Sequence, residues 1–271
     1  GGGASTSKKL LAAFAVLAVA FAVFAAIPVA VDDSDATGVT VYVDADSTSE
    51  TSDGSESKPY KTLKAALEST ATVDGSTIIL KSNIKDTEAT DGIFTISKAV
   101  TIKSADSKDK KVLPFGISTN KSLTLQDVVL SPTVNKVALS VNGTDAVIDV
   151  EKCIINVNGG TTDTVRGDGV IISKAASVTF KNNTFNNVTS GHYVRAMFIR
   201  DVSGNVDIDT NTAAGFHVFA ALHAVSTGEV EGKVALATVQ NNTSTGMTGD
   251  FQILARSEER RVGKECRSRW S

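Results

Sequence analysis

The sequence has few cysteine, methionine, proline and aromatic residues. Cys153 is the only cysteine outside the last sixteen residues, which excludes an intramolecular disulfide in the body of the chain. Without such a staple, the 271 residues must stabilise their fold with a large hydrophobic core. The single tryptophan, Trp270, also lies in those last residues, so the body offers few flat rings on which sugars usually stack.

Excess positive charge is confined to two short segments at the ends of the chain. Lys8 and Lys9 precede an uncharged run from Leu10 to Val31, and six basic residues crowd into residues 256–271. The net charge of the whole chain is −3, so the body between these segments is more acidic than the total shows. Phosphate binding needs a concentrated cationic face, and the acidic body therefore argues against nucleic acid as a partner.

Residues 1–36 have the layout of an export signal. A positive flank comes first, then the apolar run, then a small-x-small cleavage candidate from Ser34 to Ala36. The apolar run is also long enough to cross a bilayer, so a retained N-terminal membrane anchor stays the alternative to a cleaved signal peptide. Both interpretations place the body outside the cytoplasm, in the extracellular space or on the cell surface.

The last residues, RSEERRVGKECRSRWS, resemble the conceptual translation of a common sequencing-library adapter along their whole length. They also lack the helical period and the interleaved aromatic residues of a nucleic-acid-binding arm. We therefore interpret residues 256–271 as a non-native tail and residues 37–255 as the folded domain. The native C-terminus is then unknown, and the chain is expected to be a fragment.

One short pattern recurs seven times along the body. In each copy apolar residues alternate with polar ones, and a polar stretch that often contains Asn follows. An alternation of period two in Val, Ile, Thr and Phe predicts β-strands. Successive copies are 22 to 31 residues apart, and they begin at Thr77, Ala99, Ser122, Val147, Ser177, Asn205 and Leu236.

Each repeat is too small to bury its own apolar face, so neighbouring repeats must stack on one another. Second apolar runs at residues 92–96, 136–141, 169–173 and 195–200 supply further strands between the copies. Such coils predict an all-β parallel solenoid, with coils from about residue 77. An antiparallel β-sandwich also uses short alternating strands and is the alternative, but it does not predict the recurring polar stretch.

A short helix is expected before the first coil. In residues 58–70, Pro59 is suited to the first helical position, and Leu63, Ala66 and Leu67 fall on one helical face. The open end of a solenoid exposes its core and invites edge pairing. We therefore expect this helix to cap the first coil.

The segment from Val41 to Leu67, VYVDADSTSETSDGSESKPYKTLKAAL, resembles the N-terminal signature of right-handed parallel β-helix proteins of the pectate-lyase-like superfamily. The match consists of a strand, a Gly/Ser/Asp-rich loop around Gly54, and an aromatic-Lys-Thr-Leu helix start. The resemblance covers most of residues 39–255 and implies a right-handed coil. Members of the superfamily include polysaccharide lyases, hydrolases and adhesin-like surface proteins, so the fold does not decide the function.

A lyase or hydrolase of this fold needs clustered acidic residues with a nearby basic residue. Asp207 and Asp209 alternate on one face of a predicted strand and, with Arg195, are the weak catalytic candidates. The simpler interpretation is a pair of solvated outward positions. Neighbouring coils show no second acidic pair at the equivalent place, where we align Ser177, Thr179, Leu236 and Thr238.

Calcium is the only cofactor that the sequence suggests. Asp44, Asp46 and Asp53 lie in one acidic loop, which lacks the Gly and Glu positions of a helix-loop-helix calcium site. Weak calcium binding and a merely solvated loop both stay open. The VRGDGV segment, Val165 to Val170, is interpreted as a turn before a strand.

Acceptor sequons for N-glycosylation are frequent. Solenoid corners also use stacked, hydrogen-bonded Asn ladders, and for Asn182 and Asn241, which occupy the same place in the repeat, we weigh a ladder and a glycan equally. The sequons begin at Asn120, Asn142, Asn182, Asn187, Asn241 and Asn242.

Two functions follow as hypotheses. The first is an exported, adhesin-like surface protein that presents an elongated face to glycans, matrix or other cells, with no catalysis required. The second is a polysaccharide lyase or glycoside hydrolase of the same fold. Contact with a membrane is expected only through the N-terminal segment, if it is not cleaved.

Overall fold

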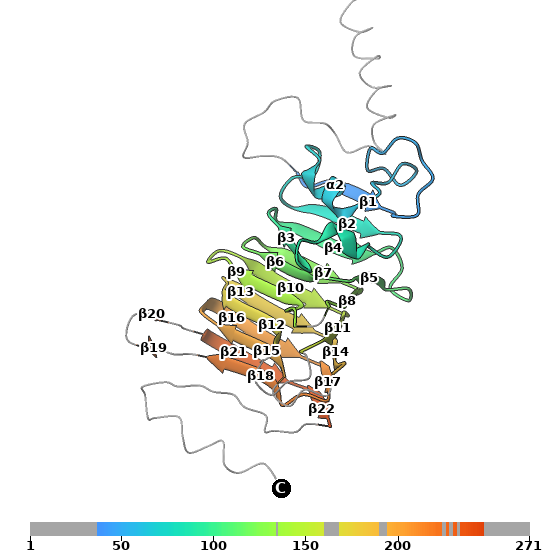
Figure 1. The fold of residues 1–271 in the computed structure, drawn as a ribbon. Helices are drawn as coiled ribbons and strands as arrows, with labels where there is room; N and C mark the ends of the chain where they lie inside the picture. Colours follow the sequence, from blue (N-terminus) through green and yellow to red (C-terminus); the bar gives the residue numbers. More distant parts are fainter. Residues whose placement is uncertain are drawn as a thin grey trace, which may run out of the picture.

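The computed structural model describes residues 37–133, 135–159, 168–189, 194–223, 226–227, 230–231 and 234–246. They form a stack of coils in which each strand pairs in parallel with its counterpart in the next coil. The stack runs from β1 at one end to β21 and β22 at the other (Figure 1). The predicted parallel β-solenoid is confirmed, and the antiparallel sandwich is wrong because the pairings within the three large sheets are all parallel.

Three sheets run along the stack, and we call them sheets A, B and C. Sheet A contains the copies of the recurring pattern together with the opening strand β1. Its strands, in spatial order, are β1 (Thr40–Val43), β2 (Ser76–Leu80), β4 (Val100–Ser104), β7 (Leu123–Gln126), β10 (Val147–Glu151), β13 (Ser177–Lys181), β16 (Val202–Asp209) and β21 (Val234–Gln240).

Sheets B and C complete each coil. Sheet B contains the second apolar runs, with β3 (Ile93–Ile96), β6 (Gly116–Thr119), β9 (Leu139–Asn142), β12 (Asp168–Lys174), β15 (Arg195–Arg200) and β18 (Val218–His223). The strands of sheet C are β5 (Lys111–Leu113), β8 (Val128–Leu130), β11 (Ile154–Val157), β14 (Thr184–Asn187), β17 (Thr212–Ala214) and β22 (Thr243–Thr245). A 3-10 turn, Asp86–Glu88, and an antiparallel pair, β19 (Ser226–Thr227) with β20 (Val230–Glu231), stand apart from them.

The inward positions of the strands form one continuous core. In β2, Ile78 and Leu80 are buried and alternate with half-buried outward residues, as the period of a strand requires. Phe180 and Phe185 lie in the same core with their ring centroids 6.2 Å apart. Each fully buried Leu, Ile or Phe stabilises the fold by about 1.5–3 kcal/mol. Stacking therefore supplies the buried apolar area that a single coil lacks.

The corner between sheets A and C contains one residue with a positive φ in each of five successive coils. In the last three of these coils an Asn follows this residue directly, and the three side chains stack inside the corner: Asn183 Nδ2 donates to Asn211 Oδ1, and Asn211 Nδ2 donates to Asn242 Oδ1, each over 2.9 Å. An Asn ladder, one of the two alternatives for Asn182 and Asn241, therefore exists at this corner, but its members lie one residue later in the chain. The positive-φ residues are Asp127, Lys152, Asn182, Thr210 and Asn241, with φ between 54° and 56°.

Helix α2 (Leu63–Glu68) lies within the expected residues 58–70 and buries Leu63, Ala66 and Leu67. It begins later than expected, because Thr62 is the N-cap: its side chain accepts a hydrogen bond from the Ala65 N–H over 3.0 Å. Its function as a cap of the stack stays a prediction.

The predicted signal and tail lie outside the described residues, and the domain boundaries at 36 and 255 stay predictions. In the part of the chain that the structure describes, no helix has the length and apolar character that a membrane crossing requires.

Candidate functional site

Charged side chains gather on the outer face of sheet A, on the neighbouring strands β10, β13 and β16. The register places Thr179 between Asp149 and Asp207 in one row, and Lys181 between the acids of the next row. All of them alternate with buried residues, so their side chains point away from the core. Two acidic pairs therefore flank one lysine. We call these residues the sheet A charge cluster: Asp149, Glu151, Lys181, Asp207 and Asp209.

Lys181 holds the centre of the cluster. Its Nζ lies 2.8 Å from Asp207 Oδ2. This hydrogen bond and the negative charges of Asp207, Asp209 and Asp149 raise the pKa of Lys181, so the lysine is a fixed cation and not a base. The other oxygen of Asp207, Oδ1, is shielded from solvent and has no hydrogen-bond partner among the described residues.

The outer carboxylates of the cluster have opposite pKa shifts. Burial, reinforced by the charge of Glu151, raises the pKa of Asp149, and Lys181 opposes the shift. Hydrogen bonds from the Asn241 amide and the Thr210 hydroxyl lower the pKa of Asp209. One carboxyl is thus inclined to hold a proton and another to remain ionised, which is the asymmetry that general acid–base chemistry uses.

Arg195 does not join this cluster. It lies on β15 in sheet B, where its guanidinium donates two hydrogen bonds to Asp168, at 2.5 and 2.6 Å, and stacks over the Phe198 ring at 4.2 Å. The predicted turn does not include Asp168, which begins β12 and is buried. Arg195 is therefore committed to a structural ion pair, on a different sheet from Asp207 and Asp209.

The prediction that neighbouring coils hold no second acidic pair is wrong, because it rests on an alignment that is two residues out of register. In the structure Asp207 is level with Thr179 and Thr238, and Asp209 with Lys181 and Gln240. An alignment shifted by two residues places Ser177 and Leu236 level with Asp207, and Thr179 and Thr238 level with Asp209, which hides the alternation of charge. The second pair, Asp149 and Glu151, lies two strands away from Asp207 and Asp209.

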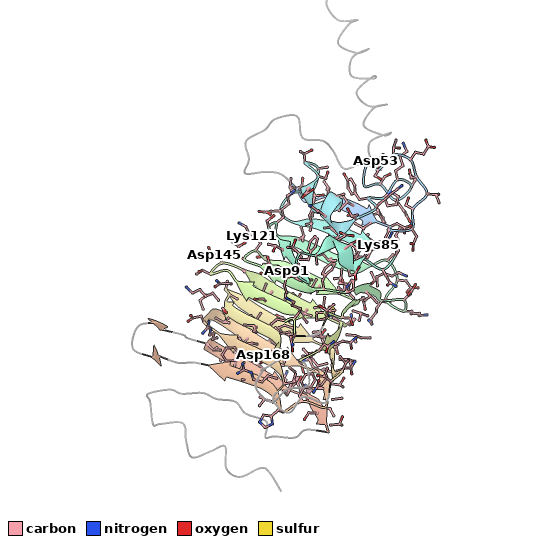
Figure 2. All side chains as sticks on the ribbon, viewed as in Figure 1. Asp53, Lys85, Asp91, Lys121, Asp145 and Asp168 are labelled. Atoms are coloured by element: carbon pink, nitrogen blue, oxygen red, sulfur yellow. The ribbon has the colours of Figure 1, made fainter. Side chains whose placement is uncertain are left out.

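The acidic loop uses its carboxylates to close turns. Asp44 Oδ1 accepts from the Asp46 N–H over 3.1 Å, and Asp53 Oδ1 accepts from the Ser55 N–H over 3.0 Å. Figure 2 places Asp53 at the N-terminal end of the stack and Asp168 in its other half. Among the residues with described positions, no three His, Cys, Asp or Glu side chains are grouped so as to hold a metal ion. Calcium binding stays a prediction.

The six sequon asparagines occupy different environments. Asn120, Asn142 and Asn182 are exposed. Asn241 is exposed, and its Nδ2 donates to Asp209. Asn187 Nδ2 donates to the Gly215 carbonyl over 2.7 Å, and Asn242 Nδ2 donates to the Ile208 carbonyl over 2.8 Å. A glycan replaces a hydrogen on Nδ2, so the exposed amides are better suited to carry one.

No family model, no curated protein and no solved structure matches the chain significantly. The likeness to the pectate-lyase-like superfamily rests on residues 41–67 and on the coils, and it stays a prediction, as does the right-handed sense of the coil.

Proposed function

We propose that this is an exported, adhesin-like β-helix protein of the cell surface that binds extended ligands along the outer face of sheet A. Glycans, matrix components or other cells would supply these ligands. In this proposal residues 1–36 act as the export signal. Helix α2, whose buried face packs against β1, caps the first coil of the solenoid.

One observation carries this proposal. A single outward row on sheet A repeats the same short polar side chain, and only Asp149 and Asp207 interrupt it. Rungs of a parallel sheet repeat every 4.7–4.9 Å or so, and the row therefore offers regularly spaced hydroxyl groups to a partner that is itself linear and repetitive. The row consists of Thr40, Thr77, Thr101, Thr124, Asp149, Thr179, Asp207 and Thr238.

The proposal is tested by retention on insoluble neutral polysaccharides, acidic polysaccharides and matrix proteins. Wild-type protein should be retained by at least one of these. The double variant Thr101→Val with Thr124→Val should reduce retention severalfold, because it removes two hydroxyl groups from the row without adding charge. Thr212→Val, at an exposed position on sheet C, is the matched control and should have no effect. Failure of wild-type protein to bind any polymer would contradict the proposal.

A second candidate, a polysaccharide lyase or glycoside hydrolase, is favoured by the two acidic pairs around Lys181. Along the sheet, Asp149 and Asp207 are two rungs apart, about 9–10 Å at the backbone, close to the carboxyl separation of about 6.5–9.5 Å in inverting glycosidases. Incubation with neutral and acidic polysaccharides, with and without Ca²⁺, should then release unsaturated products or new reducing ends. Asp207→Asn should abolish the release, whereas Lys103→Met, three rungs from Lys181 in the same row, should not.

A further inference from the structure

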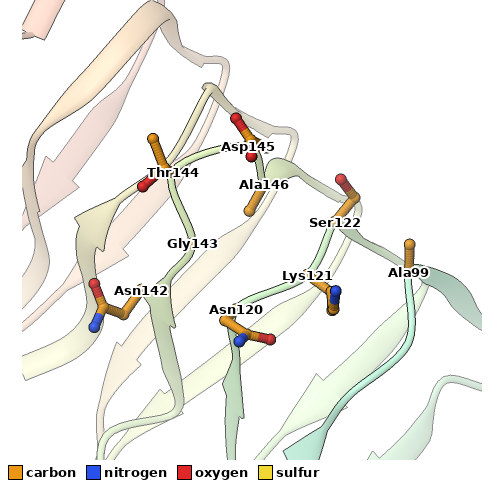
Figure 3. Close-up of a pocket in the computed structure, with 9 residues that line it drawn as sticks. All are labelled: Ala99, Asn120, Lys121, Ser122, Asn142, Gly143, Thr144, Asp145 and Ala146. Carbon is orange, nitrogen blue, oxygen red and sulfur yellow. The ribbon is translucent and has the colours of Figure 1, made fainter.

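A polar hollow of about 350 Å³ lies where the chain turns from sheet B into sheet A. This volume is near the lower end of the range of about 300–1,000 Å³ that is usual for small-molecule sites. Figure 3 shows the hollow between successive turns of the stack. It is lined by Ala99, Asn120, Lys121, Ser122, Asn142, Gly143, Thr144, Asp145 and Ala146.

The hollow exists because one turn is longer than its neighbours. Four residues, 143–146, connect β9 to β10, whereas three, 120–122, connect β6 to β7, and two, 175–176, connect β12 to β13. The longer turn is closed by a hydrogen bond from the Ala146 N–H to the Gly143 carbonyl over 3.0 Å. A Cβ on Gly143 would lie 2.1 Å from the Asn120 carbonyl oxygen, so only glycine lets the two turns stack this closely.

Apart from the Ser122 hydroxyl, which accepts a hydrogen bond from the Val147 N–H over 3.0 Å, the polar side chains that line the hollow are not used by the fold. Among the described residues, no hydrogen bond or ion pair engages the side chains of Asn120, Lys121, Asn142, Thr144 or Asp145. The register of β6 with β9 places the two asparagines side by side (Figure 3). The site therefore presents two free amides and a free hydroxyl in one place.

The chemistry of this lining selects the ligand. An apolar molecule would leave the amides and the hydroxyl without partners, which costs about 1–3 kcal/mol for each buried group. A strongly charged molecule would meet one like charge and one opposite charge, from Lys121 and Asp145, and would gain little. A neutral molecule with several hydroxyl groups satisfies the lining best.

The hollow adjoins the face that we propose to bind extended ligands. Ser122 and Ala146 directly precede β7 and β10, and Thr124 of the threonine row follows two residues after Ser122. A polymer lying along the threonine row crosses β7 at Thr124, two residues from Ser122, so one of its units would reach the hollow. We propose that the hollow binds one neutral sugar unit of an extended glycan on sheet A, an inference that rests on the proposed function.

The test uses saturation-transfer NMR with methyl glycosides of glucose, galactose, mannose and N-acetylglucosamine and their neutral oligomers. The full chain is made in a host without N-glycosylation, because a glycan on Asn120 or Asn142 would itself fill the hollow. One sugar series should bind. Asn120→Ala with Asn142→Ala should weaken that binding about tenfold, as expected for the loss of two neutral hydrogen bonds.

Two further variants make the outcome unambiguous. Thr144→Val is nearly isosteric and removes only a hydroxyl from an exposed turn, so it should weaken binding without changing the melting temperature. Asn186→Ala, on sheet C, is the matched control and should bind like wild type. Failure of every neutral sugar to bind, or binding that survives the hollow variants, would overturn the inference. Retention on polymers that depends on Thr101 and Thr124 would still support the proposed function in either case.

Discussion

Asn183 and Asn211 are joined twice at the corner of the stack: the side-chain amide and the backbone N–H of Asn183 both donate to Asn211 Oδ1, each over 2.9 Å. Asn211 repeats both bonds to Asn242. Each amide also donates a hydrogen bond to a backbone carbonyl in the strand of the preceding coil: Asn211 Nδ2, for example, donates to the Phe180 carbonyl on β13. The ladder thus satisfies buried backbone groups that no strand can pair.

Asn211→Ala should lower the free energy of unfolding by about 3 kcal/mol, because it leaves the Asn183 N–H and the Phe180 carbonyl buried without partners. Asn186→Ala removes one bond of 3.1 Å to Asn156 on the outer face and should cost less than about 1 kcal/mol. Urea unfolding of both variants measures the difference. Equal losses in the free energy of unfolding would show that the ladder at the corner stabilises the protein no more than an exposed hydrogen bond does.

Thr210 is a β-branched residue in a left-handed conformation, with φ of 55°. At the equivalent corner of the preceding coil stands Asn182, a residue type that tolerates this conformation. Thr210→Asn should therefore stabilise the protein by about 1 kcal/mol, and the reverse change, Asn182→Thr, should destabilise it by about as much. The melting temperatures of the two variants, compared with wild type, measure both effects. A lower melting temperature for Thr210→Asn would show that Thr210 is not strained.

The pH dependence of stability should report on Asp149. Burial and Glu151 raise its pKa above the ordinary value of 3.8, so the folded protein holds the proton more tightly than the unfolded chain does. This contribution is fully present below the ordinary pKa and is lost as the pH rises through the raised value. Asp149→Asn should therefore gain stability relative to wild type as the pH rises from about 3 to about 7.

Lys181→Met extends the same test. The lysine charge opposes the upward shift in the pKa of Asp149, so its removal should raise the pKa of that carboxyl further. The Lys181→Met protein should therefore lose more stability than wild type as the pH rises. Unfolding curves across the pH range, with Lys103→Met as control, measure the effect. A flat difference between Asp149→Asn and wild type would mean that Asp149 is not perturbed.

Glycan occupancy should follow the freedom of each amide. In an N-glycosylating host, glycopeptide mass spectrometry of folded protein should find glycans at Asn120 or Asn142 and none at Asn242, whose Nδ2 bonds the Ile208 carbonyl inside the corner. Asn120→Gln should leave stability unchanged, whereas Asn242→Gln should lower it. Full occupancy at Asn242 would contradict the described ladder.

The strands of sheet A were predictable from sequence because their buried residues alternate, as Ile78 and Leu80 do in β2. The strands of sheet C were harder to predict. They are three or four residues long, such as β17 with three, and are too short to show a period. The Asn ladder was predictable in kind but displaced by one residue, because the positive-φ residue before each ladder member shifts the inward position.

The charge cluster was predictable from the alternation within each copy of the pattern. The coils differ in length, 30 residues from Ile148 to Val178 and 28 from Val178 to Val206, but the turns absorb the difference and the strands stay in register. The pairing of Arg195 with Asp168, 27 residues apart, depends on the same register. Alignment of the inward residues in each copy was the available signal, and it would have placed Lys181 level with Glu151 and Asp209.

Coils that stack in register along one axis place the residues of the threonine row at regular intervals, which distances between spin labels measure. Cys153 is buried, with its thiol pKa raised to about 12, so only Cys266 needs replacement by Ser before cysteines are introduced. Labels at Thr77 and Thr179 span four rungs, and labels at Thr77 and Thr238 span six. We expect separations of about 19 and 29 Å, because each rung adds about 4.7–4.9 Å. A second distance equal to or shorter than the first would contradict it.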